Sequence, residues 1–363
     1  MAQNIQTQTL KKQNSFMDFL KKEIVLVIAI VLAITSSFIS IPKLSYIDFK
    51  VLILLFNLMI VVAAFKELKV LDSIAIGLLK KCNTYTSISF ALVFITFVPL
   101  SIVIARKANI DVLKIVIFQT LAANLGSSFT PMGNPQNLFI YSYYDLSPID
   151  FLKITLPIVI LAIVFLSILI IKNKKMKLKL DLSDVIMENK KDVILFSLLF
   201  VIILLSVFHL IDYKITFIIT IVTVLILNKR LFKEVDYSLL LTFTGFFIFI
   251  GNISTMDVVR NFMENILNSE KSTFISSILA SQTISNVPAT MLLSGFTNHF
   301  KELLLGVNIG GMGTLIASLA SVISYKIYTS EFKDNNDRYL SKFTLYNVLG
   351  LGVFVPMIYL LLF

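Results

Sequence analysis

The sequence contains few of the residues that build metal centres and catalytic sites. Its single cysteine, Cys82, excludes an intrachain disulfide and a cysteine-ligated metal cluster. The two histidines, His209 and His299, lie far apart near the ends of apolar segments, and we interpret them as interfacial residues. The sequence has no HExxH motif and no paired Asp or His motif, so it does not indicate an enzyme.

Charged residues are scarce as well. They make up 15% of the chain against 57% hydrophobic residues, which excludes an ordinary soluble domain. Apolar segments recur from residue 24 to residue 363, so the sequence predicts a polytopic membrane protein without a sizeable soluble domain. The net charge of +10 comes from lysines and arginines gathered between these segments, as membrane topology requires, and does not indicate a nucleic-acid partner.

The apolar segments predict an all-α protein with nine crossings and two hairpins. The first crossing is interpreted as a retained helix and not a cleaved signal peptide, because roughly eighteen apolar residues can span a bilayer and further spans follow. The crossings are expected at 24–41, 49–65, 110–144, 151–171, 193–210, 215–227, 238–253, 303–328 and 345–363.

Two further apolar segments, 85–105 and 274–296, carry Pro99 and Pro288 near their middles. Each could be one kinked span. We interpret both as re-entrant hairpins that return to the side they entered from, because this assignment places every basic cluster on one face of the membrane. Two amphipathic stretches suit helices in the interface plane, 67–81 and 256–267.

The chain divides into an N-terminal segment, a first repeat, a linker and a second repeat, at 1–22, 23–171, 172–192 and 193–363. The linker holds seven lysines and is therefore placed in the cytoplasm. Nine crossings of the cytoplasmic membrane then leave the N-terminus inside and the C-terminus outside. The interrupted segments are the third and eighth crossings and run in opposite directions, so we predict two inverted repeats, the second with one extra scaffold helix.

Residues 124–137, NLGSSFTPMGNPQN, interrupt the third crossing. Pro131 and Pro135 each remove a backbone donor, and Gly126 and Gly133 permit non-helical angles, so the helix is expected to break here. A polar surface loop is the alternative. The apolar flanks are too short to span alone, which favours a break at membrane depth, where protein or a watery cavity must surround it.

A second stretch, 308–318 or NIGGMGTLIAS, aligns with the first at an offset of 308 − 124 = 184. Asn308, Gly310 and Thr314 fall on the asparagine, glycine and threonine at the corresponding places of the first break. The offset is about half the chain length. Interrupted apolar segments at matching places in two halves point to the binding site of a transporter.

The two breaks and the two hairpin tips would bring helix ends and unwound backbone together. Helix N-termini attract anions, whereas unwound carbonyls and helix C-termini can coordinate sodium. Hydroxyl groups also pack in helix interfaces, and that role is preferred for Ser101 and Ser321. The candidate substrate- or ion-binding residues are Asn124, Gly126, Ser127, Ser128, Thr130, Asn134 and Asn137 in the first half, and Ser285, Asn286, Thr290, Asn308, Gly310, Gly311, Thr314 and Ser318 in the second.

Acids are missing from both breaks. Asp111 is the only acid close to either one, and it lies near the predicted cytoplasmic end. A proton-relaying antiporter usually needs an acid inside the membrane. The sequence therefore favours an anion or a neutral solute that moves with sodium or down its own gradient.

The same motifs resemble those of the ion transporter superfamily, in particular its citrate-transporter-like members: divalent anion:sodium symporters, citrate–metal carriers, arsenite permeases and sodium/proton antiporters. NLGSSFTPMGNPQN is similar to the signature N-I-G-G-x-x-T-x-x-G-D-P-x-N, and SNVPAT (285–290) is similar to the motif of the second hairpin. The resemblance implies a scaffold and a mobile transport domain, an elevator-type movement and a homodimer.

The resemblance also implies cation sites at each hairpin tip and its neighbouring break, with sodium near Ser285, Asn286, Asn308 and Gly310. The chain departs from the family pattern at the first hairpin, where Thr96-Phe97-Val98 replaces S-N-T. Asn134 likewise stands where many relatives carry aspartate, which argues against a sodium/proton antiporter.

The function expected from the sequence is secondary transport of a small anion, including di- and tricarboxylates, coupled to sodium or proton. An arsenite or antimonite efflux permease is the nearest alternative, and a passive anion channel is an alternative of another class. No cofactor is expected apart from sodium as a coupling ion. The expected partners are a small anionic or neutral solute, membrane lipid and a second copy of the chain.

Overall fold

The structure, a computed structural model, describes residues 23–95, 98–108, 112–171, 185, 187, 189–332 and 336–363. All regular secondary structure in these residues is helical, without strands, so the prediction of an all-α protein is confirmed. Residues 1–22, the predicted hairpin tip at Thr96-Phe97, Asp111 and most of the linker at 172–192 lie outside the described residues.

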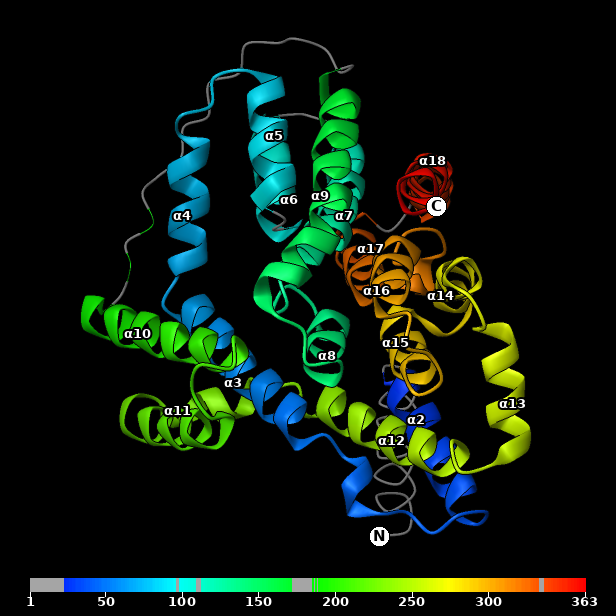
Figure 1. Ribbon diagram of the computed structural model, residues 1–363. Helices are drawn as coiled ribbons and strands as arrows, with labels where there is room; N and C mark the ends of the chain where they lie inside the picture. The colour runs from blue at the N-terminus through cyan, green and yellow to red at the C-terminus, as the bar shows by residue number, and fades with distance from the viewer. Residues whose placement is uncertain are drawn as a thin grey trace, which may run out of the picture.

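The helices occur where the apolar segments predict them (Figure 1). Those of the first half are α2 (Ile24–Ser37), α3 (Phe49–Glu67), α4 (Val70–Leu79), α5 (Tyr85–Ile95), α6 (Val98–Ala108), α7 (Val112–Gly126), α8 (Pro135–Tyr143) and α9 (Pro148–Ile171). Those of the second half are α10 (Lys190–Val207), α11 (Tyr213–Leu227), α12 (Tyr237–Ile253), α13 (Asp257–Ile266), α14 (Glu270–Ile284), α15 (Asn286–Ser294), α16 (Phe300–Gly310), α17 (Leu319–Glu331) and α18 (Asn336–Leu362).

Short 3-10 turns complete the helical structure: η1 (Leu44–Tyr46), η2 (Ser127–Phe129), η3 (Lys229–Lys233) and η4 (Leu315–Ala317). The largest difference from prediction is at α18, which begins at Asn336 and not at residue 345. The polar residues before 345 form helix all the same, because tertiary contacts such as those of buried Tyr339 and Phe343 hold these turns in place.

Four helical segments in the described residues are long and apolar enough to cross a membrane, and a fifth is counted if α12 and α13, which meet at a bend of 103°, form one span. The four are Phe49–Glu67, Val112–Phe129, Pro148–Ile171 and Asn336–Leu362. Val112–Phe129 is longer than the sequence predicts, because α7 continues through Gly126 into η2. The number of crossings predicted from the sequence, nine, stays a prediction.

The eight helices of the first half, α2 to α9, correspond one by one to α11 to α18 of the second half. Helix α10 has no counterpart in the first half among the described residues. The helices α3 and α12 even begin with the same cap. The side-chain oxygen of Asp48 accepts from the backbone N–H of Val51 at 3.1 Å, and that of Asp236 accepts from Leu239 at 2.9 Å. Such caps satisfy N–H groups that have no partner within the helix.

Contacts between the halves come in pairs in which each helix is replaced by its counterpart in the other half. Helix α2 packs against α12, and their counterparts α11 and α3 also pack against each other. In the same way α7 contacts α17 while α16 contacts α8, and α6 contacts α17 while α15 contacts α8. Exchanged contacts of this kind are what a twofold relation between two similar units produces.

The chain turns back on itself between α14 and α15. Ser285, at the turn, has φ +71°, a left-handed value that breaks the helix. At the open end, the hydroxyls of Thr273 and Thr297 lie 3.4 Å apart. The two helices therefore form a hairpin whose tip is at Ser285, as Pro288 and the SNVP sequence predict. In the first half, the side-chain amide of Gln119 joins α5 to α6 by donating to Leu92 O at 2.8 Å and Ser101 Oγ at 2.6 Å.

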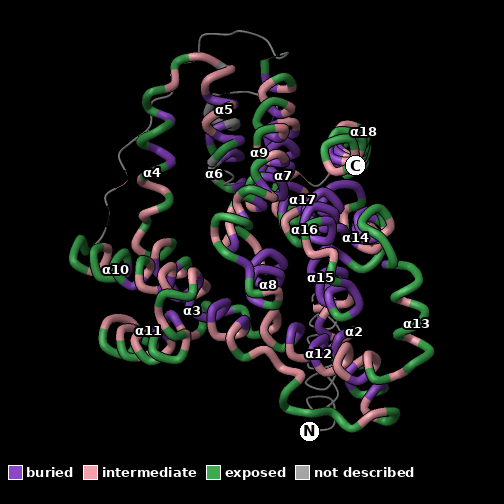
Figure 2. Tube along the Cα trace, in the orientation of Figure 1, coloured by how far each residue is buried: buried purple, intermediate pink, exposed green. Residues whose placement is uncertain are grey.

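Two hydrophobic clusters hold the helices together. Most buried residues of the first cluster come from α5, α6, α7, α9 and α18, and most of those of the second come from α3, α8, α10, α12 and α15, while α16 contributes to both. In Figure 1, α5, α7 and α9 lie above α3, α10 and α12, and α8, α15 and α16 lie between these two groups of helices. Burial is greatest along α7, α8, α15 and α16 (Figure 2), whereas the amphipathic α13 has no buried residue. The segments predicted to form the site are thus the interior of the molecule.

Close approach of α14 and α16 depends on glycine. A β-carbon at Gly306 would lie 2.6 Å from Ser277 Cβ and 2.7 Å from the carbonyl oxygen of Phe274. We expect Gly306→Ala to force the two helices apart and to lower the free energy of unfolding by about 1–3 kcal/mol. Gly77→Ala, in α4, is the matched control, because its β-carbon would meet nothing within 4 Å.

Thermal unfolding of the two purified variants in detergent tests this expectation. The unfolding temperature should fall for Gly306→Ala, and it should stay equal or rise for Gly77→Ala, since alanine in a helix restricts the unfolded chain more than glycine does. Equal unfolding temperatures would contradict the proposed role of Gly306.

Candidate functional site

Both predicted breaks occur, and they occur at equivalent places. Helix α7 ends at Gly126 and α16 ends at Gly310, and the following helices begin after the caps Asn134 and Ser318. Each pair differs by 184 residues, the offset of the sequence alignment. The break in the first half includes a turn that only glycine fits, since a β-carbon at Gly133 would lie 2.0 Å from the carbonyl oxygen of Ser127.

The caps that restart the helices are built alike. The side-chain oxygen of Asn134 accepts from the backbone N–H of Asn137 at 2.8 Å. The hydroxyl of Ser318 accepts from the backbone N–H of Ser321 at 3.2 Å. Asparagine and serine are favoured at this position because their side chains bond the first free N–H groups of a helix.

Side-chain amides tie each break to the other half. Asn124 donates to Ser321 Oγ at 3.3 Å and to the carbonyl oxygen of Gly311 at 3.1 Å. Asn308 donates to Asn137 Oδ1 at 2.7 Å. At the offset of 184, residue 308 corresponds to 124 and residue 321 corresponds to 137. The bond from Asn124 to Ser321 and the bond from Asn308 to Asn137 therefore join equivalent positions, the first donated by the first half and the second by the second half. Ser321, expected from the sequence to pack and to form hydrogen bonds within a helix interface, is one of these partners.

Asn134 adds a third bond between the halves. Its amide nitrogen donates to Asn308 Oδ1 at 3.1 Å and to Ser127 Oγ at 3.1 Å. Asn308, which is 1% exposed, thereby uses its oxygen as well as its nitrogen. The result is a buried network of asparagine side chains at the centre of the molecule, in which the amide nitrogens of Asn124, Asn134, Asn137 and Asn308 all have acceptors.

In each break, backbone carbonyl oxygens accept hydrogen bonds from a side-chain amide of the same half. In the first half, Asn137 Nδ2 lies 3.2 Å from the carbonyl oxygens of Ser127, Ser128 and Thr130. In the second half, Gln282 Nε2 lies 2.7 Å from that of Gly310 and 2.9 Å from that of Met312. An amide NH₂ therefore satisfies carbonyls that could otherwise face a cation.

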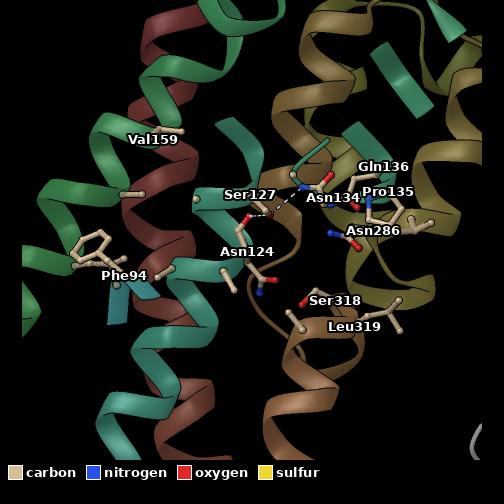
Figure 3. A pocket seen from close by; sticks show the side chains of 18 of the residues that line it. Phe94, Asn124, Ser127, Asn134, Pro135, Gln136, Val159, Asn286, Ser318 and Leu319 are labelled. Carbon is tan, nitrogen blue, oxygen red and sulfur yellow. Dashed lines mark hydrogen bonds between the residues drawn. The ribbon is translucent and has the colours of Figure 1, made fainter. Parts of the chain in front are cut away.

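A cavity of about 580 Å³ opens beside this network (Figure 3). Its polar wall includes side chains of both breaks and of the hairpin tip: Asn124, Ser127, Asn134, Gln136, Asn286 and Ser318. Its apolar wall includes Phe94 of α5, Val287 and Leu319 of the second half, and four residues of α9: Val159, Ala162, Ile163 and Leu166. A cavity of this size and lining is typical of a small-molecule site.

Three helices direct their N-termini at the cavity. The first residues or caps of α8, α15 and α17 line it, as do the last residues of α7. Free N–H groups at a helix start carry partial positive charge and attract anions. No Asp, Glu, Lys, Arg or His is among the described residues that line the cavity.

Asn286 stands apart from the other asparagines. It opens α15 directly after the turn at Ser285, lines the cavity and is 5% exposed. Figure 3 places its amide between Asn134 and Ser318. Within the described part of the chain, this amide has no hydrogen-bond partner. A buried amide without a partner, directed into a cavity, is a group available to a ligand.

Six of the fifteen residues predicted to form the site line the cavity: Asn124, Gly126, Ser127, Asn134, Asn286 and Ser318. The others lie nearby in structural roles. Thr290 donates to the carbonyl of Asn286, Thr314 donates to that of Gln282, and Gly310 packs against Ser281 of α14. Not lining the cavity are Ser128, Thr130, Asn137, Ser285, Thr290, Asn308, Gly310, Gly311 and Thr314.

Two features of this region were not predicted from the sequence. One is the apolar wall from α9, whose residues look like those of any spanning helix. The other is Glu302, an acid that is 5% exposed in the first turn of α16. It precedes the end of α16 at Gly310 by eight residues, about 12 Å of helix, and does not line the cavity. The prediction that Asp111 is the only acid close to a break is therefore wrong, because Glu302 lies nearer to one along the chain. An acid within an apolar segment was the available signal for it.

Residues 14–298 match the citrate transporter family (CitMHS). The chain is 33% identical over 300 residues to an uncharacterized transporter of Methanocaldococcus jannaschii, a match that covers 77% of this chain and 81% of the relative. It is 30% identical over 255 residues to the inner membrane protein YbiR of Escherichia coli, a match that covers 69% of this chain and 66% of the relative.

A 46 kDa membrane protein of Mycobacterium leprae is 25% identical over 341 residues, covering 78% of this chain and 79% of the relative. The family match includes the first break and the hairpin of α14 and α15, which contribute to the cavity, but ends before the second break. The resemblance seen in the motifs is thereby confirmed. The chain is a multi-pass membrane protein and belongs to the citrate transporter family of transporters.

Proposed function

We propose that the protein is a secondary active transporter that moves a small anion across the cytoplasmic membrane, with the central cavity as its binding site. One observation carries the proposal. Two equivalent helix breaks and a hairpin tip line one cavity, and three helices begin at it. Amides and hydroxyls there can bind the oxygens of an anion, and the N-termini supply the opposite partial charge.

The proposal includes two inverted repeats, 23–171 and 193–363, joined by a cytoplasmic linker at 172–192. The exchanged helix contacts and the exchanged bonds of Asn124 and Asn308 support an antiparallel twofold relation. We propose nine crossings and two hairpins, with the N-terminus (1–22) in the cytoplasm and the C-terminus outside.

The proposed mechanism is an elevator-type movement within a homodimer. The cavity receives residues from both hydrophobic clusters, since Ala162 and Leu166 belong to the first and Val287 to the second. A site at the border between two hydrophobic clusters supports alternating access, in which the elements on its two sides move relative to each other.

Accumulation against a gradient tests the proposal. Purified protein in proteoliposomes should concentrate labelled solute inside when a sodium or proton gradient is imposed, and only equilibrate it when the gradient is collapsed. Equilibration without accumulation under every gradient would identify the alternative, a passive anion channel.

An arsenite or antimonite permease remains the second candidate function. It is favoured by the lining, which contains no charged residue among those described and suits a neutral hydroxylated solute. Competition by citrate, succinate, sulfate and arsenite for uptake separates the candidates, because each should compete only with solutes of its own class.

The coupling ion expected from the sequence is sodium or proton, and we propose proton. The carbonyls of Ser127, Ser128 and Thr130 already accept from Asn137, and that of Gly310 accepts from Gln282, so these oxygens are less available to sodium than the free carbonyls of an unwound helix would be.

We therefore expect uptake to be unchanged, within about twofold, when choline replaces external sodium, and to respond severalfold to an imposed pH gradient. Initial uptake rates in proteoliposomes with matched ionic strength measure both effects. A tenfold loss of uptake without sodium would assign the coupling to sodium instead.

A further inference from the structure

We infer that Gln136 is a second solute-binding residue of the cavity, and that its amide and the amide of Asn286 together donate hydrogen bonds to oxygens of the solute. This inference rests on the proposed function and names two groups that hold its solute. Gln136 is not among the residues that the sequence predicts for the site. Two observations carry its assignment, the state of its amide and the packing of the helix on which it lies.

The amides of Gln136 and Asn286 are free in a part of the molecule where other polar groups are engaged. Gln136 is 4% exposed, as buried as Asn286, and neither amide has a hydrogen-bond partner among the described residues. A buried amide that has lost water without gaining a partner costs free energy, and a bound solute removes that cost. The other polar side chains that line the cavity are bonded within the protein: Asn124, Ser127, Asn134 and Ser318.

The two helices that carry these amides lie side by side and run in the same direction. Helices α8 and α15 are in contact, and each has nine residues. At their far ends, the hydroxyl of Tyr144, the C-cap of α8, donates to the carbonyl oxygen of Ser294, the last residue of α15, at 3.2 Å. Their first turns both line the cavity, where Figure 3 shows Gln136 and Asn286 on the same side. One solute can therefore reach both amides.

The backbone of the same two turns supplies further donors. The N–H groups of Gln136, Asn286 and Val287 have no partner among the described residues, as is usual for the first residues of a helix. Side-chain and backbone N–H groups that meet at helix starts are typical of sites for the oxygens of an anion. These hydrogen bonds are local, so they depend on donor distance and direction and not on a net charge of the cavity.

Removal of the amide tests the inference. Gln136→Met keeps the length of the side chain and leaves no protein group without a partner. Uptake of labelled succinate, citrate, sulfate and arsenite into proteoliposomes is measured one solute at a time, and the solute with the highest wild-type uptake is the probe. We expect Gln136→Met to lower the initial uptake of this probe by at least about tenfold and to keep the wild-type unfolding temperature.

The same substitution at an engaged glutamine is the matched contrast. The amide of Gln119 donates to Leu92 O and Ser101 Oγ, so Gln119→Met should lower the unfolding temperature. Wild-type uptake by Gln136→Met would overturn the inference. A fall in its unfolding temperature as large as that of Gln119→Met would overturn it as well, because the amide would then serve the fold.

An introduced cysteine gives a readout that does not depend on transport. In a Cys82→Ser background, Gln136→Cys should react with a small charged methanethiosulfonate reagent added in water, since the side chain lines the cavity. Leu138→Cys, two residues further along α8 and buried in the second hydrophobic cluster, should stay unmodified. An unreactive Gln136→Cys in folded protein would contradict the position given to this residue.

The outcomes separate this inference from the function it rests on. Loss of uptake in Asn286→Ala but not in Gln136→Met would refute the pair of amides and keep the transporter. Absence of wild-type uptake for all four solutes under every gradient would refute the proposed function, and with it the role of the pair in uptake.

Discussion

The variant Asn286→Ala should lose solute uptake, by at least about a hundredfold, while the protein stays folded. Its amide lies in the cavity at the start of α15 and bonds no other described residue. The substitution therefore orphans no protein group, and the hydrogen bond that Thr290 makes to the backbone carbonyl of residue 286 is kept. The free energy of unfolding should change by less than about 1 kcal/mol.

Uptake into proteoliposomes and the unfolding temperature in detergent, measured on the same preparation, check both parts. The control is Thr283→Ala, in the exposed last turn of α14, which should transport like the wild type. Wild-type uptake by Asn286→Ala would remove this residue from the site. A lower unfolding temperature would show that its role lies in folding.

The opposite result is expected for a second asparagine, Asn308. Its nitrogen donates to Asn137 and to the carbonyl of Leu304, and its oxygen accepts from Asn134, all inside the protein. Asn308→Ala leaves those groups without partners and removes volume from the core. Each orphaned buried group costs about 1–3 kcal/mol, so the free energy of unfolding should fall by about 2–5 kcal/mol.

A substitution of an asparagine without hydrogen bonds is the control for Asn308→Ala. It shows whether the loss of stability comes from the lost hydrogen bonds or from replacing any buried asparagine. Asn57 in α3 is fully buried, and neither the nitrogen nor the oxygen of its amide has a hydrogen-bond partner among the residues that the structure describes. Asn57→Leu keeps the number and branching of the side-chain heavy atoms and should raise the unfolding temperature or leave it equal, because it removes a polar amide that is desolvated without a hydrogen bond in return. The role given to the asparagine network would be refuted if Asn308→Ala unfolded at the temperature of the wild type.

Glycine and proline predicted the position of the breaks well. Their conformational effects are local, so Gly126, Pro135 and Gly310 mark helix ends whatever surrounds them. The repeat offset of 184 likewise survives in the structure, in the helix ends and in the caps. These features depend on the chain near each residue, which is what a sequence displays.

The roles of the individual amides could not be predicted. Asn137 and Asn286 are the same residue type at comparable breaks, yet one satisfies three backbone carbonyls and the other faces the cavity. Which amide is used internally depends on distances across the two halves. The apolar wall escaped prediction for a related reason, since a valine such as Val159 has the same pattern whether it faces lipid, core or cavity.

The hydrogen bonds between the two breaks cannot form until the second half of the chain has been synthesised. Asn137 is made 171 residues before Asn308, its partner, and Asn124 is made 197 residues before Ser321. At about 5–20 residues per second, the ribosome takes roughly 10–40 s to supply them. Throughout that interval the amide nitrogen of Asn124 and the side-chain oxygen of Asn137 lack the partners that the second half supplies. The nascent first half therefore has to satisfy these groups with water or lipid headgroups until the second half is made.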